Sequence, residues 1–222
     1  MLEIILVFII GACFGSFACV LAYRLTGMCR KCFGRMSILY PTVGLLCGAL
    51  FAATVLIYGF PGAVPFLLMV FALLVITLVD LKTHEIPDSM IILIIFLAVF
   101  WIVAYPASIN VKAAMIGAAA GAAPLFIVDR IALLILKKDG FGYGDMKLMG
   151  AAGLLIGWQG VLIAFFFAFI TGAVAALYML MTKKAKRGGY IAFGPFLSGG
   201  ILIAAWSYEI LGTHLLNFMI LV

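Results

Sequence analysis

The chain has 222 residues, of which 68% are hydrophobic and 10% are charged, and its formal net charge is +6. So few charged side chains cannot give a chain of this length a polar exterior on all sides, which excludes a wholly soluble protein and places part of its surface in lipid. The basic residues fall in short segments between apolar runs, where they orient a chain in the bilayer, so we do not expect nucleic acid as a partner.

Eight apolar runs follow one another, and most approach the ~20 residues needed to cross a bilayer. They span residues 2–23, 38–58, 63–79, 89–105, 111–136, 146–156, 161–181 and 193–215. The first contains Glu3 rather than a basic segment and shows no cleavage site of small residues, so we expect it to be retained. We therefore predict an all-α, polytopic membrane protein with about eight transmembrane helices in one domain, residues 1–222.

The distribution of charge supports eight crossings. If every run crosses, 13 of the 14 lysines and arginines fall on one side of the membrane and only Lys112 on the other. The positive-inside rule makes the first side cytoplasmic and puts both termini outside. A short run 146–156 that failed to cross would separate the basic clusters at Lys137 and Lys183, so the charges favour a crossing. The longest polar connections, 24–37 and 137–145, are both on the cytoplasmic side, where we expect any chemistry.

The stretch Phe141-Gly-Tyr-Gly-Asp145 places an acidic side chain at the mouth of an apolar run. Because glycine has no Cβ, Gly142 and Gly144 would let the backbone of a polypeptide substrate approach Asp145 closely. An acid at the membrane edge is costly and suggests a functional site. The alternative is a glycine-rich turn whose aspartate caps the next helix.

A second acid, Asp80, follows an apolar run and lies on the same predicted side as Asp145, so the two can converge at one depth. Peptide hydrolysis without a metal or a covalent nucleophile needs such a pair. One carboxylate accepts a proton from water while the other, protonated, polarises the scissile carbonyl, because close carboxylates do not easily both ionise. Lys82 and Lys147 each stand two residues after an aspartate and either support the site or anchor the chain at the membrane surface.

Other polar residues nearby have simpler roles. Asp88 follows Pro87 and precedes an apolar run, so we expect it to cap a helix. We expect Glu85 and Asp139 to be solvated loop residues. His84 has no evident serine or cysteine partner in the sequence, which argues against a histidine-led triad.

Seven pieces of the chain together resemble the type IV prepilin peptidase family, nearly from end to end, and the two aspartate motifs are the specific ones. The pieces are Gly11-x-x-x-Gly15-Ser16-Phe17, Tyr23-Arg24, Cys29-x-x-Cys32, Tyr40-Pro41, Asp80 to Asp88, Gly142-Tyr-Gly-Asp145-x-Lys147 and Phe193-Gly194-Pro195-Phe196.

The resemblance implies an aspartic endopeptidase in the inner (cytoplasmic) membrane of bacteria, with Asp80 and Asp145 as its catalytic pair. Its substrates are prepilins and pseudopilins of type IV pili, type II secretion or DNA-uptake systems. The family removes a short basic leader at the cytoplasmic face, after a glycine that precedes the hydrophobic segment of the pilin. The implied partners are these substrates, together with the lipid bilayer. We predict no cofactor for this chain, and the oligomeric state is left open.

The chain also departs from the larger members of the family. They carry two CxxC pairs suited to one zinc ion, whereas the loop 24–37 holds only Cys29 and Cys32, too few for the usual four ligands, so we predict no metal. Larger members also methylate the new pilin N-terminus with S-adenosylmethionine and carry a glutamate after Tyr-Pro-x-Val, where this chain has Gly44. We predict peptidase action alone.

Three alternatives compete with this interpretation. A proton- or ion-coupled transporter would relay charge through Asp80, Asp129 and Asp145, although such sites usually lie at the midplane within inverted repeats. An intramembrane protease of the presenilin type shares Gly-x-Gly-Asp but has tyrosine before its partner aspartate, where this chain has Val79. A non-enzymatic assembly protein would fit if the two acids lay too far apart to share a water.

Overall fold

The structure is a computed structural model that describes residues 2–27, 39–105, 110–136, 142–182 and 192–221. Within these residues the chain forms helices and no strand, as the all-α prediction requires. The helices are α1 (Leu2–Leu25), α2 (Leu39–Tyr58), α3 (Val64–Thr83), α4 (Asp88–Ala104), α5 (Val111–Leu136), α6 (Tyr143–Met181) and α7 (Gly194–Leu221).

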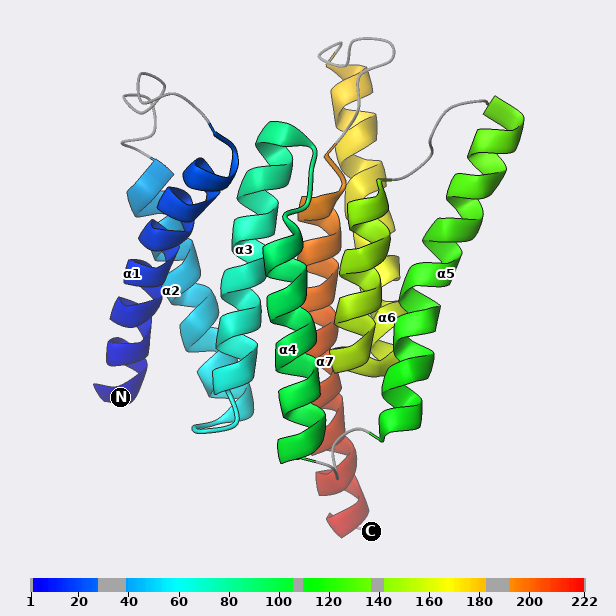
Figure 1. Ribbon diagram of the computed structural model, residues 1–222. Coiled ribbons are helices and arrows are strands. Elements are labelled where there is room, and N and C mark those ends of the chain that lie inside the picture. Colours follow the sequence, from blue (N-terminus) through cyan, green and yellow to red (C-terminus); the bar gives the residue numbers. More distant parts are fainter. Residues whose placement is uncertain (1, 28–38, 106–109, 137–141, 183–191, 222) are drawn as a thin grey trace.

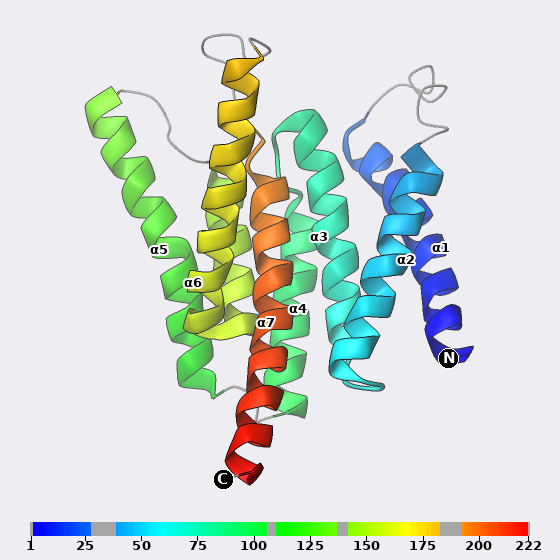
Figure 2. The same cartoon turned by 180° about the vertical axis from the view of Figure 1, so that it is seen from behind.

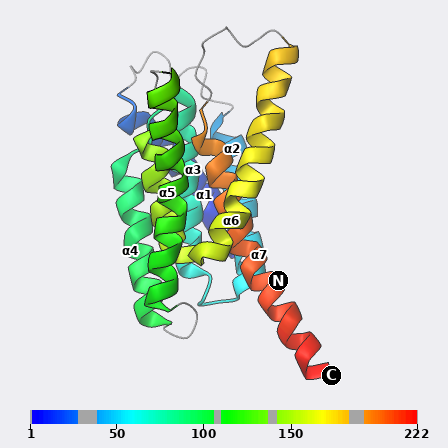
Figure 3. The same cartoon turned by 90° about the vertical axis from the view of Figure 1, so that its right-hand side faces the viewer.

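The sixth and seventh predicted runs are the two arms of α6. One residue inside this helix, Gly157, is not helical, with φ 67° and ψ 176°. Glycine adopts this combination readily and other residues hardly at all. The chain reverses at Gly157, so that the first arm descends beside α5 and the second rises beside α7 (Figures 1 and 3).

The helices run alternately up and down through one bundle. The end of α3 and the starts of α4, α6 and α7 share one end, here called the upper end from its place in Figure 1. The start of α1 and the end of α7 lie toward the opposite, lower end (Figures 1 and 2). The topology therefore brings the segments that follow α3 and precede α6 to the same end of the molecule.

The described helices have the length and composition of membrane spans. Five are long and apolar enough to cross a bilayer, and two shorter apolar stretches, Asp88–Ala104 and Gly194–Ser207, accompany them. The described residues contain five lysines and arginines. Four of them lie toward the upper end, on α1, α3, α5 and α6, and only Lys112, near the start of α5, lies at the lower end. The chain is therefore a multi-pass, all-α membrane protein.

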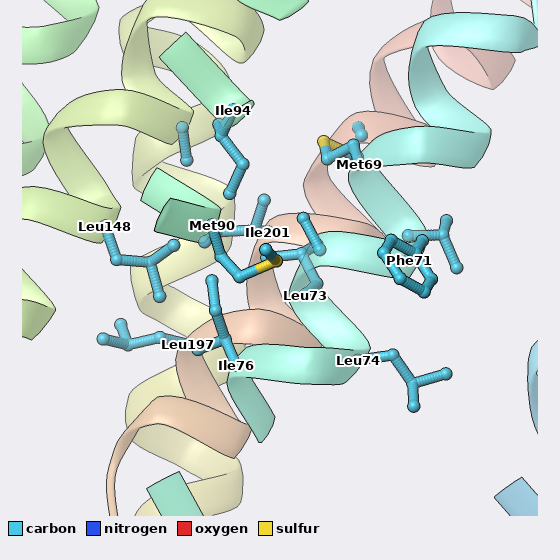
Figure 4. Packing of buried hydrophobic residues seen from close by; sticks show 14 of the residues in the cluster. Met69, Phe71, Leu73, Leu74, Ile76, Met90, Ile94, Leu148, Leu197 and Ile201 are labelled. Atoms are coloured by element: carbon cyan, nitrogen blue, oxygen red, sulfur yellow. The ribbon is translucent and has the colours of Figure 1, made fainter. Parts of the chain in front are cut away.

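An apolar core lies directly beneath the upper end. Ile76 of α3, Leu148 of α6 and Leu197 of α7 are fully buried, and Met90 of α4 is nearly so. Figure 4 shows these side chains meeting between the four helices. Ile76 lies one turn before Asp80, and Leu148 lies one turn after Asp145, so the two acids sit above an apolar floor.

Aromatic rings gather at the lower end. Tyr58 at the end of α2 stacks on Phe66 at 3.8 Å, and Phe66 contacts Trp101 of α4 at 5.0 Å between ring centroids. Trp101 in turn lies 4.3 Å from Tyr105. The Tyr58 hydroxyl donates to the carbonyl of Ala205 at 2.7 Å, which joins α2 to α7 at this level.

The α1–α2 pair packs closely enough to account for Gly44. A Cβ on Gly44 would lie 3.1 Å from the Ala12 carbonyl oxygen and 3.3 Å from the Ser16 hydroxyl. The position at which larger members of the resembled family carry glutamate therefore faces α1 in this chain, with little room for a side chain.

Candidate active site

Asp80 lies in the last turn of α3 and is only 5% exposed. Its Oδ2 accepts a hydrogen bond of 2.8 Å from the backbone N–H of Gly194, the first residue of α7. The helix ends one turn later at His84, which has φ 55° and donates its N–H to the Asp80 carbonyl at 3.0 Å. The end of α3 therefore holds a buried carboxylate whose hydrogen-bond donor comes from a distant helix.

Asp145 is the third residue of α6 and is 9% exposed. The helix begins after Gly142, whose extended backbone precedes the first turn and whose carbonyl accepts the Asp145 N–H at 3.1 Å. The Asp145 carboxylate interacts with the backbone N–H of Gly142 and electrostatically with Asp80. The structure thus brings the two predicted acids close enough for their charges to interact. Each carboxylate also has one backbone N–H as a partner, and in both cases that N–H belongs to a glycine at the start of a helix.

The interaction of Asp145 with Gly142 means that the capping alternative is partly correct. A side chain at the third helical position often reaches back to the amide of the residue before the helix. One backbone donor occupies only part of the capacity of a carboxylate, which has about four acceptor positions. Asp145 can therefore hold the start of its helix and still face Asp80.

Gly144 and Lys147 join the two aspartate segments. A Cβ on Gly144 would lie 2.8 Å from the Cβ of Ile86, so the missing side chain lets α6 pack on the segment after α3. This contact gives Gly144 a packing role, and the substrate access that the sequence suggests for it stays a prediction. Lys147 forms an ion pair of 2.8 Å with Asp88, the first residue of α4.

The start of α6 also contacts α5, through Arg130. Its guanidinium donates to the Tyr143 hydroxyl at 2.7 Å and lies 4.9 Å from the centroid of the Phe126 ring. Tyr143 is two residues before Asp145. This contact did not follow from the sequence, because an arginine next to Asp129 inside an apolar run gives no signal of a tyrosine partner 13 residues away.

Several other predicted residues can now be placed. Lys82, His84 and Glu85 are exposed around the end of α3. The expectation that Asp88 caps α4 is wrong, because Pro87 occupies the cap position and Asp88 pairs with Lys147 instead. Three further predicted residues, Cys29, Cys32 and Asp139, lie outside the described residues. Within the described residues, no three histidines, cysteines or acids form a group that could hold a metal ion.

The arrangement has the parts needed to activate a water molecule. Two buried carboxyl groups from separate helices lie within electrostatic range of each other, one turn from the buried apolar side chains of Ile76 and Leu148. When two carboxyls interact, one can hold a proton while the other is ionised, which supplies a general acid and a general base from a single residue type.

Comparison with known proteins points to one family. The model of the type IV leader peptidase family matches residues 66–177, a segment that contains both acids. A prepilin leader peptidase/N-methyltransferase of Stutzerimonas stutzeri is 32% identical over 193 residues, covering 86% of this chain and 66% of the relative. Its counterpart in Neisseria gonorrhoeae is 33% identical over 184 residues, covering 82% of this chain and 63% of that relative.

A third relative, the prepilin leader peptidase/N-methyltransferase of Pseudomonas putida, is 29% identical over 199 residues, covering 88% of this chain and 69% of the relative. The chain thus spans about two thirds of the length of the curated relatives that it matches. No solved structure shows a significant match to it.

Proposed function

Because this chain belongs to the type IV leader peptidase family, we propose that it is a membrane-embedded aspartic endopeptidase that removes the leader peptide from type IV prepilins or pseudopilins. The observation that carries the proposal is the pair of buried, interacting carboxylates, Asp80 and Asp145, at one end of a helical bundle. The names of the relatives support the choice of substrate.

In the proposed reaction the ionised carboxylate of the pair takes a proton from water. The water oxygen then bonds to the scissile carbonyl carbon, while the protonated carboxyl group gives its proton to the carbonyl oxygen. Collapse of the tetrahedral intermediate breaks the C–N bond. The departing nitrogen receives a proton from the carboxyl group that took one from water, and one hydroxyl of the intermediate returns a proton to the other carboxylate, which restores the pair. The products are a leader with a new carboxyl end and a pilin with a new amino end.

The substrate is proposed to reach the upper end from two environments. Its hydrophobic helix enters from the lipid, while its short basic leader stays at the cytoplasmic face of the inner membrane. The exposed acid Glu85, next to the end of α3, is placed to attract such a leader. Charge reversal at Glu85 that left the cleavage rate at low salt unchanged would remove this part of the proposal.

We propose peptidase action without methyl transfer. The relatives are named as peptidase and N-methyltransferase together, but this chain has Gly44, packed against α1, at the position where larger members of the family carry a glutamate. Mass spectrometry of a pilin matured by the purified protein with S-adenosylmethionine should show an unmethylated N-terminus. A methyl group on that N-terminus would contradict the prediction.

The decisive experiment is cleavage of a model prepilin, with a basic leader that ends in glycine before an apolar helix, in membranes containing the protein. Asp80→Asn and Asp145→Asn should each lower the rate by at least about 100-fold, the usual size of a general acid or base contribution. Asp88→Asn, which alters an exposed acid at the same end, is the matched control and should retain most of the activity.

Retention of cleavage by either Asp80→Asn or Asp145→Asn would exclude that residue from the mechanism. A wild-type protein that cuts no prepilin but carries protons into proteoliposomes, with the flux abolished by Asp145→Asn, would favour the transporter alternative.

A further inference from the structure

The hydrogen bond that α7 donates to Asp80 leaves no space for a side chain. A Cβ built on Gly194 would lie 2.7 Å from Oδ2 of Asp80, 2.9 Å from its Cγ and 3.1 Å from its Cβ. The first two distances, 2.7 and 2.9 Å, are shorter than the contacts that Cβ atoms make in proteins. The amide of Gly194 therefore reaches the carboxylate only because residue 194 is glycine.

The position of Gly194 at the start of a helix also favours the negative charge of Asp80. Asp80 lies in the last turn of α3, where unpaired carbonyl groups disfavour a negative charge. Gly194 opens α7, where unpaired N–H groups favour one. The start of α7 thus offsets the unfavourable position of Asp80 in its own helix.

Phe193 and the second arm of α6 hold the start of α7 in place. Phe193, just before the helix, accepts the N–H groups of Phe196 and Leu197 at 3.1 Å each. Its ring lies 5.7 Å from that of Phe169 on the second arm of α6. A Cβ on Gly172 would lie 3.1 Å from the same ring, so the second arm of α6 packs closely against it.

We propose that Gly194 is a positioning residue of the peptidase, whose backbone amide fixes Oδ2 of Asp80 and leaves the other carboxylate oxygen for the water and Asp145. This inference rests on the proposed function for its catalytic consequence but not for the contact itself. Gly194 lies outside the segment 66–177 that the family model matches.

The kinetic test compares Gly194→Ala with Gly199→Ala, which adds the same methyl group on the same helix where nothing lies within 4 Å. Gly194→Ala should lower kcat for prepilin cleavage by about 10- to 100-fold, because a displacement of about 1 Å at a reacting group has an effect of this size. The KM should stay within about twofold, because Asp80 is moved while the surfaces for the leader and the helix are unchanged. Gly199→Ala should keep the wild-type kcat. An unchanged kcat for Gly194→Ala, or a rise in KM alone, would overturn the proposal.

A second test needs no activity. The fall in melting temperature caused by Gly194→Ala is measured in the wild-type chain and in Asp80→Ala, which removes the two atoms that the new methyl group would meet most closely. The fall should be at least halved in Asp80→Ala. If Gly194→Ala folds only together with Asp80→Ala, the contact is supported. An equal fall in both chains, or failure to fold in both, would overturn it.

The two tests separate the inference from the proposed function. A wild-type chain that cuts no prepilin would remove the peptidase and with it the role of Gly194 in positioning a catalytic group. The melting temperatures would still decide whether the start of α7 holds Asp80 in place.

Discussion

Gly144 lies against Ile86, where a methyl group in place of its hydrogen would come within 2.8 Å of the Ile86 Cβ. The sequence pattern Gly-x-Gly-Asp is consistent with open access for a substrate. The structure adds a packing role for the second glycine, because the missing side chain lets the start of α6 approach the segment after Asp80. The separation of the two acids therefore depends on the absence of a side chain at position 144.

Gly144→Ala should destabilise the protein by about 1–3 kcal/mol, as overpacking of a close contact usually does. It should also lower prepilin cleavage, because relief of the contact moves Asp145 away from Asp80. Gly150→Ala is the control on the same helix, since its methyl group would meet its nearest neighbour at an ordinary 3.5 Å. Equal stability and activity for the two variants would show that the contact does not set the geometry of the pair.

Tyr143 offers a milder change at the same helix start. Tyr143→Phe removes only the hydroxyl that Arg130 contacts at 2.7 Å. A hydrogen bond to a charged group contributes about 1.5–3 kcal/mol, and the exposure of Tyr143 places the loss at or below the lower value. We expect a fall in kcat with little change in KM. Tyr178→Phe, which changes an equally exposed tyrosine on the second arm of α6, should behave as wild type. A fall in kcat that is the same for both variants would exclude a role for the Arg130 contact.

At the residue scale, the sequence predicted both acids and the end of the molecule on which they meet. It did not predict their supports. The donor to Asp80 is 114 residues away in the chain, and the partner of Arg130 is 13 residues away, so neither contact follows from local spacing. The motif that contains Gly194 can be recognised in the sequence, but the role of Gly194 depends on the position of the start of α7 beside Asp80.

At the scale of helices, the break in α6 is the feature on which the site depends. The sequence predicted a gap between the runs 146–156 and 161–181, which the turn at Gly157 confirms. The first arm carries Asp145, and the second contacts Phe193 at the start of α7. The composition predicted the break but not the direction of the second arm, because that direction depends on the backbone conformation of Gly157.

Gly157→Ala should destabilise the protein by about 1–3 kcal/mol, the usual cost of forcing a residue with a Cβ into a backbone region reserved for glycine. The backbone of Gly157 also packs on Gly117 of α5, where a Cβ on Gly117 would lie 2.9 Å from the Gly157 Cα. Unfolding in mixed detergent micelles measures the effect, with Gly199→Ala as the control. A loss no larger than that of the control would mean that α6 reverses without needing glycine.

The ion pair between Lys147 and Asp88 should contribute little to stability, because its side chains are 54% and 67% exposed. Lys147→Met should lower the free energy of unfolding by less than about 1 kcal/mol at low salt, and the difference should shrink at high salt. Lys82→Met is the control, as Lys82 is exposed and forms no ion pair with the residues that the structure describes. A larger loss that does not depend on salt would show that Lys147 supports the site in another way.

At the scale of the whole molecule, the charges predict the orientation in the membrane. The upper end carries four of the five cations in the described residues, and from this bias the positive-inside rule predicts that Asp80 and Asp145 lie at the cytoplasmic side. Helix count and charge bias suffice for this prediction, because neither depends on how the helices pack.

Orientation can be tested with single cysteines in a variant that lacks the five native ones. A membrane-impermeant maleimide should label Lys112→Cys from outside intact cells and should label Lys82→Cys only in inverted vesicles. The matched pair lies on the same chain at opposite ends of the bundle. Labelling of Lys82→Cys from outside would reverse the assigned orientation and put the two acids on the wrong side for a cytoplasmic leader.

The cluster of aromatic side chains at the lower end also indicates how deep Asp80 lies in the membrane. Tyrosine and tryptophan concentrate at the boundary between lipid and water, so we expect Tyr58, Trp101 and Tyr105, which lie around the buried Phe66, to mark the outer boundary of the hydrocarbon layer. From Phe66 to Asp80 the chain advances by 14 residues, which is ~21 Å of helix. The layer is ~30 Å thick, so Asp80 stops short of its inner boundary. If the proposed peptidase cuts at Asp80, the scissile peptide bond must first be drawn several ångströms below the surface of the membrane, and the residues on either side of that bond must tolerate transfer from water into lipid.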